Sequence, residues 1–74
     1  MSADTDEALV KDIAREAVSQ AGFESCGTAE DEQAAKARAH QLALEVLKFQ
    51  RLEHMHAALS HWVDEEAKKV SRFS

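Results

Sequence analysis

The chain contains no proline and no tyrosine, only two glycines and a single cysteine, Cys26, among its 74 residues. One cysteine excludes an intrachain disulfide. Without proline, long stretches of the sequence hold no residue that forces a helix to end. Few glycines together with abundant alanine, glutamate, lysine and leucine are typical of a helical protein. The sequence therefore predicts an all-α fold that no disulfide stabilises.

Large apolar side chains are scarcer than the hydrophobic content of 45% suggests, because 14 of the residues counted are alanines. A domain of this length buries only about 60% of the surface that its unfolded chain exposes. Scaffolds of this size usually gain further stability from a disulfide, a metal ion or a partner subunit. With the disulfide excluded, we expect a metal or a partner.

The formal net charge is −5, which argues against a protein that binds nucleic acid through a basic surface. Residues 1–32 carry nine acids and two bases, whereas residues 33–74 carry five acids and seven bases. Acids near helix starts and bases near helix ends account for this asymmetry. The alternatives are that the acidic half pairs with the basic half of a neighbouring chain, or that it occupies the basic site of a nucleic-acid-handling protein.

The sequence contains no recognisable signal that would target the protein to a compartment other than the cytosol. The N-terminus is acidic and lacks the apolar core of a signal peptide. No apolar run approaches the roughly 20 residues that span a bilayer. A free thiol without a secretory segment fits a reducing compartment. We expect a cytoplasmic protein that has no membrane-spanning segment.

The first helix is predicted over residues 5–21, with Asp4 or Thr5 as its N-cap. An apolar stripe recurs every four positions along it, at Leu9, Ile13, Ala17 and Ala21. This spacing places the four side chains on one face of the helix, which is therefore expected to pack against another element.

A short connection is predicted over residues 22–28. Gly22 suits the positive φ that ends many helices, and Val18 and Phe23 fit the apolar contact of a Schellman motif around it. Thr28 is a natural N-cap for the next helix, with an acid three residues later as in a capping box.

From residue 29 to about residue 72 no glycine or proline interrupts the sequence, which predicts one continuous second helix over 29–72. At 1.5 Å per residue this helix is about 65 Å long, against about 25 Å for the first. The short connection predicts that the two pack as an antiparallel hairpin. The alternative is a kink near Ser60 that closes a three-helix bundle, but kinks usually have a proline, glycine or serine-pair cause.

The predicted second helix extends well beyond the first, so one hairpin cannot cover its half from Phe49 to Phe73. Apolar residues nevertheless follow this half at a spacing near 3.5, which favours packing against a partner helix. Two hairpins that share these residues form a dimeric four-helix bundle, and the expected partner is a second copy. A different protein that binds the C-terminal half of the helix is the other possibility. The predicted interface consists of Leu42, Val46, Phe49, Leu52, Met55, Leu59, Trp62, Val63, Val70 and Phe73.

A metal site is the alternative reading of the same helix. Glu53 and His56 are spaced i,i+3, as are ligands of the diiron sites in ferritin-like helical bundles. His61 and Glu65 form a second pair at i,i+4. At an oligomer interface these residues would bind iron or zinc, with a further carboxylate such as Glu16 from the first helix. Otherwise, His56 is an interface histidine that is hydrogen-bonded to a glutamate or glutamine.

No pattern of catalytic residues is visible. The serines lack a nucleophile elbow, and the sequence has no phosphate-binding loop. Cys26 precedes a helix N-terminus, which favours a reactive thiolate, but the nearby Glu24 opposes its formation. We therefore expect no enzyme and no cofactor. The predicted function is that of a small interaction or oligomerisation module, an adaptor, regulator or inhibitor, with the metal-binding bundle as the alternative.

Overall fold

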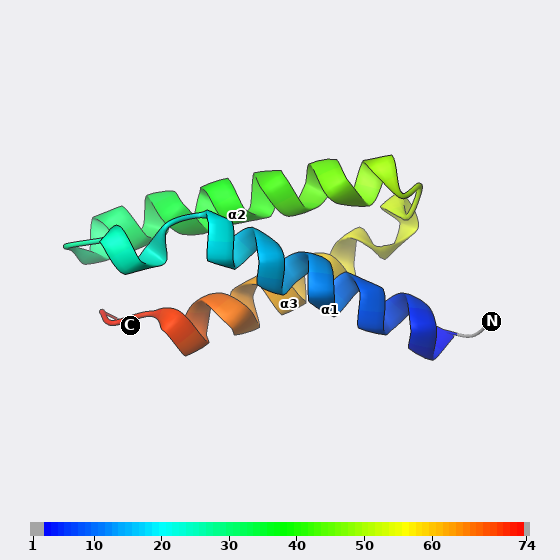
Figure 1. Ribbon diagram of the computed structural model, residues 1–74, viewed down its shortest axis with the longest axis horizontal. Helices are drawn as coiled ribbons and strands as arrows, with labels where there is room; N and C mark the ends of the chain where they lie inside the picture. Colours follow the sequence, from blue (N-terminus) through cyan, green and yellow to red (C-terminus); the bar gives the residue numbers. More distant parts are fainter. Residues whose placement is uncertain (1–2, 74) are drawn as a thin grey trace.

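Three helices packed side by side make up the chain in this computed structural model, which describes residues 3–73 and the side chains of residues 6–73 (Figure 1). They are α1 (Ala3–Gln20), α2 (Ala29–Phe49) and α3 (His56–Val70), joined through the short 3-10 turns η1 (Phe23–Ser25) and η2 (Glu53–Met55). The predicted all-α class is confirmed. None of the described helices is both long enough and apolar enough to cross a bilayer.

The predicted hairpin with a continuous helix over 29–72 is wrong. The chain leaves α2 after Phe49, reverses, and returns as α3, which packs against both α1 and α2 (Figure 1). The molecule measures 42 × 19 × 16 Å, too short for a helix of about 65 Å. The alternative prediction of a three-helix bundle is closer to the observed structure, although the helix breaks several residues before Ser60. The reversal buries Leu59, Val63 and Ala67 of α3 within the same chain. The long unsupported half from which the dimer is predicted is therefore replaced by a third helix of the bundle.

A Schellman motif ends α2 without a glycine. The backbone N–H of Leu52 donates to the carbonyl of Leu47 at 3.0 Å, and that of Arg51 donates to the carbonyl of Lys48 at 3.0 Å. These are the two bonds that define the motif. Arg51 takes the left-handed position that is usually glycine, with φ of 61°. Leu52 packs against the core that contains the buried Leu47, which supplies the apolar contact of the motif.

The other helix ends lie close to their predicted places. Gly22 follows α1 with φ of 83°, as predicted for the residue that ends this helix. The predicted N-cap of α2 is also confirmed, because the Thr28 hydroxyl accepts from the Asp31 N–H at 3.1 Å. α1 begins at Ala3, so Asp4 and Thr5 lie inside its first turn, and their side chains are outside the described residues.

The core of the bundle is narrow because α2 presents a row of small residues to its neighbours. This row repeats every four positions at Ala35, Ala39 and Ala43 and ends at the larger Leu47, and all four residues are fully buried. Alanines allow the helices to approach closely, while the larger side chains come mainly from α1 and α3, among them Val10, Ile13, Val18, Leu59 and Val63. The alanines that dilute the hydrophobic content thus serve as the contact surface of the central helix.

Glu32 joins the first turn of α2 to the end of α3. Its carboxylate accepts hydrogen bonds from the Ser71 hydroxyl and, at 2.7 Å, from the backbone N–H of Arg72. The hydrogen bond from the Arg72 backbone and that from Ser71 hold the pKa of Glu32 below its usual value of 4.5. Although buried, this carboxylate is therefore fully partnered, and it fixes the C-terminal end of the bundle.

Asp64 makes a second polar bridge, between α3 and α2. It accepts a hydrogen bond from His40 Nε2 at 3.0 Å and forms an ion pair with Lys36 Nζ at 3.4 Å. Partial burial by itself raises the pKa of Asp64, but the His40 hydrogen bond and the Lys36 charge outweigh it and leave the pKa below 3.8. A third bridge joins α2 to the end of α1, where Arg38 Nη2 donates to the carbonyl of Ala21 at 2.9 Å.

Replacing Arg51 by glycine tests the chain reversal. Because glycine adopts positive φ without steric cost, we expect Arg51→Gly to stabilise the fold by up to about 1 kcal/mol. The matched control is Gln41→Gly in the exposed middle of α2, which should cost about 1 kcal/mol. Chemical denaturation measures both. In a continuous helix the two changes would be equally destabilising, and that result would contradict the reversal.

Replacing Glu32 by glutamine tests the carboxylate at the end of the bundle. Because its pKa is lower in the folded than in the unfolded state, Glu32 stabilises the fold above about pH 4.5 and loses this effect as the pH falls through its lowered pKa. Glu32→Gln should therefore lower the Tm near neutral pH, by an amount that shrinks as the solution is acidified. Glu30→Gln, an exposed neighbour, is the control and should leave the pH profile unchanged. If Glu32→Gln lowered the Tm equally at all pH values, this role of the carboxylate would be contradicted.

Candidate functional site

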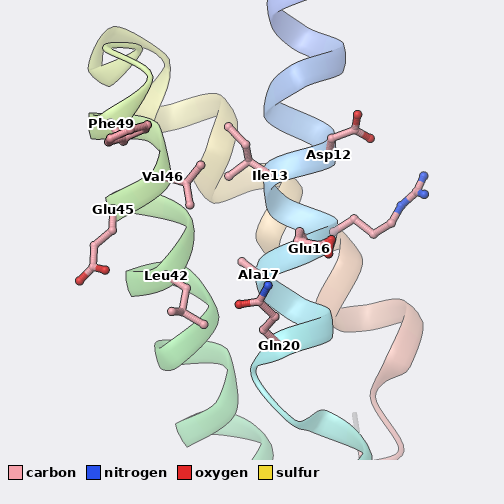
Figure 2. A pocket seen from close by; sticks show the side chains of 10 residues that line it. Asp12, Ile13, Glu16, Ala17, Gln20, Leu42, Glu45, Val46 and Phe49 are labelled. Carbon is pink, nitrogen blue, oxygen red and sulfur yellow. The ribbon is translucent and has the colours of Figure 1, made fainter.

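A groove of about 580 Å³ lies between α1 and α2 and is referred to below as the α1–α2 groove (Figure 2). Its apolar lining consists of Ile13, Ala17, Leu42, Val46 and Phe49. Its polar lining consists of Asp12, Arg15, Glu16, Gln20 and Glu45. No residue of α3 contributes, so the groove belongs to the α1–α2 pair alone.

Helical periodicity places the apolar lining on two facing stripes. Ile13 and Ala17 are one turn apart on α1 and are almost completely buried, so they form the floor. On α2, Val46 is 42% exposed and Phe49 is 85% exposed. Figure 2 shows Ile13 and Val46 on opposite sides of the gap between the two helices. The groove is therefore closed at its base by packed side chains and open along the α2 side.

Phe49 is the most exposed of the large apolar side chains in residues 6–73. It is the last residue of α2, so the chain reversal that follows it leaves no later residue of the helix to cover it. Burying such a side chain is worth about 1.5–3 kcal/mol, which this fold does not gain. Leu9, one turn before Ile13 on α1, is also exposed and extends the apolar surface of that helix.

The edges of the groove are acidic. Asp12 and Glu45 point away from the gap on its two opposite sides (Figure 2), and Glu16 lies one turn after Asp12. All three are exposed, and none takes part in the ion pairs found within residues 6–73. Arg15 is the one cation among the lining residues. The groove thus combines an apolar base with a net negative rim.

The ten predicted interface residues separate into four groups. Leu42, Val46 and Phe49 come together in the groove. The others lie elsewhere: Leu59 and Val63 are buried in the core of this chain, Leu52, Met55 and Trp62 pack partly against that core, and Val70 and Phe73 are partly exposed at its C-terminal end. The contribution of α1 to the groove was not predicted. Its apolar stripe is visible in the sequence, but which part of that stripe stays open depends on where α3 packs.

The predicted metal ligands do not form a cluster in one copy of the chain. Within the described residues, no three side chains of histidine, cysteine, aspartate or glutamate are arranged to hold a metal ion. Glu53 lies in η2 and His56 begins α3. The His61 ring meets the edge of Trp62 with centroids 4.9 Å apart, and Glu65 pairs with Lys68 at 3.5 Å.

Cys26 and Glu16 were also candidate functional residues in the sequence. Cys26 is buried, and its thiol donates to the carbonyl of Gly22 at 3.6 Å, so it is part of the loop packing. Glu16, the carboxylate expected to complete a metal site, lines the α1–α2 groove. Within the described residues, neither joins the predicted histidines in a group that could hold a metal ion.

No similarity assigns a function to the groove. Comparison of the chain with protein-family models, with curated proteins and with solved structures finds no match. A function for the chain therefore rests on the shape, exposure and charge of the α1–α2 groove.

Proposed function

We propose that the chain is a small non-enzymatic interaction module whose α1–α2 groove binds an amphipathic helix of another protein. The observation that carries this proposal is Phe49, an 85% exposed phenylalanine at the mouth of a preformed apolar groove. Large aromatic side chains dominate the binding energy of many interfaces when a partner covers them.

A helix is the occupant that fits the dimensions. The lining spans residues 12–20 of α1 and 42–49 of α2, which is about 12 Å of helix, or a little over two turns. A helix bound in such a groove inserts apolar residues spaced i, i+4 and i+7. Laid beside α1 and α2, it would add a fourth helix to the bundle, an arrangement that helices of this length commonly adopt.

A second copy of the chain is the competing occupant, because the sequence predicts a homodimer. The main argument for it, an uncovered C-terminal half, is weakened, since α3 packs much of that half against the core of one chain. Two copies joined groove to groove would also bring Asp12, Glu16 and Glu45 of each close to the same acids of the other. Like charges that meet across an interface disfavour association. The proposal therefore takes a different protein as the partner.

Substitution of Val46 tests whether the groove binds a helix. A library of synthetic helical peptides of about 14 residues, or four turns, with leucine or phenylalanine at i, i+4 and i+7, is titrated into the labelled protein and followed by NMR. We expect binders that shift the signals of residues 12–20 and 42–49. Val46→Asp should weaken the affinity for these peptides at least about tenfold, because it places a charge against their apolar side chains.

Val70→Asp is the matched control, since Val70 is 43% exposed and lies outside the groove. It should leave peptide affinity unchanged. If no library member shifts the groove signals, or if both aspartate variants lose binding equally, the groove is not a helix-binding site.

Substitution of Phe49 separates binding from folding. Because Phe49 is so exposed, Phe49→Ala should change the free energy of unfolding by no more than about 0.5 kcal/mol, yet it should weaken peptide binding by about 1–3 kcal/mol. Leu47→Ala, two residues earlier and fully buried, should instead destabilise the fold by about 2–5 kcal/mol. Denaturation and peptide titration of the same two variants measure this contrast. A large loss of stability in Phe49→Ala would contradict the proposed role.

A further inference from the structure

We infer that the helix bound in the α1–α2 groove carries lysine or arginine residues along both edges of its apolar face, an inference that rests on the proposed function. The rim of the groove presents Asp12 and Glu16 on α1 and Glu45 on α2, opposed by Arg15 alone. A basic helix is attracted electrostatically to these acidic edges, whereas an acidic helix is repelled by them.

The spacing of the acids matches the geometry of a bound helix. Asp12 and Glu16 are related by i,i+4, so their side chains lie about 6 Å apart along one edge. Residues that flank the apolar face of an occupant are spaced in the same way. The long apolar stems of lysine and arginine can lie over the groove while their charges reach its edges. Glu45, which points outward from α2 in Figure 2, is placed for a basic residue on the opposite flank.

The three carboxylates are available to a partner. Each is exposed, and the ion pairs found within residues 6–73 use other acids. Lys11, the other cation on this part of α1, lies with its Nζ 4.4 Å from the centre of the Trp62 ring on α3. It is therefore directed toward α3 and is not among the residues that line the groove.

The acidic edges also explain which occupants are rejected. A helix with glutamate along its flanks would meet three like charges, and a second copy of this chain would bring an identical set. Charge along the edges of an interface selects partners by repelling the wrong ones as well as by attracting the right one. The rim thus restricts a groove whose apolar base would otherwise accept many amphipathic helices.

Three peptides with one apolar face and different flanks test the inference. They are about 14 residues long and carry lysine, glutamine or glutamate at every flanking position, with Kd measured by fluorescence anisotropy. At low ionic strength we expect the lysine peptide to bind about tenfold more tightly than the glutamine peptide, and the glutamate peptide to bind least tightly. The difference should vanish near 1 M salt, where charges are screened beyond about 3 Å.

Two double variants of equal net charge distinguish the effect of the rim acids on peptide binding from the effect of the overall negative charge of the chain. Glu16→Gln combined with Glu45→Gln should weaken the lysine peptide about fivefold and leave the glutamine peptide unchanged. Glu24→Gln combined with Glu30→Gln removes the same charge from exposed positions outside the groove, and it should have less than about a twofold effect.

The outcomes distinguish the inference from the function on which it rests. If the three peptides bind the groove equally, or if both double variants weaken the lysine peptide alike, the charge inference fails and the helix-binding groove stands. If no peptide binds, both fail. Self-association of the chain that Val46→Asp abolishes would identify a second copy as the occupant and overturn the basic partner.

Discussion

The structure depends on the reversal of the chain at Arg51, a non-glycine residue held in the left-handed region. That conformation costs about 1–2 kcal/mol for a residue with a side chain. The reversal brings α3 back onto α1 and α2, where Leu59 and Val63 are buried. Burial of each such side chain is worth about 1.5–3 kcal/mol, so the packing of α3 outweighs the local strain. Without this turn there would be no core shared by three helices.

The position of α3 also creates the α1–α2 groove. α3 packs against one side of the α1–α2 pair, and on the other side Val46 stays partly exposed and Phe49 largely exposed among the described residues. The alanine row of α2 and the buried Leu47 face the core, whereas Val46 and Phe49 of the same helix are exposed. One helix therefore contributes both to the core and to the exposed side of the groove.

Local signals in the sequence were reliable where the chemistry of a single residue decides the backbone. Gly22 and Thr28 mark the end of α1 and the start of α2, because positive φ and an N-cap hydroxyl are properties of those residues themselves. The end of α2 carries no such mark. Arg51 is a good helix former, and only the packing of Leu52 and α3 selects its left-handed conformation. The prediction of a continuous helix failed at the one place where local preference and tertiary packing disagree.

The sequence by itself determined the helical class, the end of α1, the start of α2 and the presence of more apolar surface than a hairpin can cover. Only the tertiary structure decided where that surface lies. Leu42, Val46 and Phe49, which the sequence predicts as interface residues, line the groove, whereas Leu59 and Val63, which share their pattern, are buried in the core. The physical reason is that periodicity shows which residues lie on one face of a helix, whereas the element that covers this face is chosen by a turn that the periodicity does not reveal.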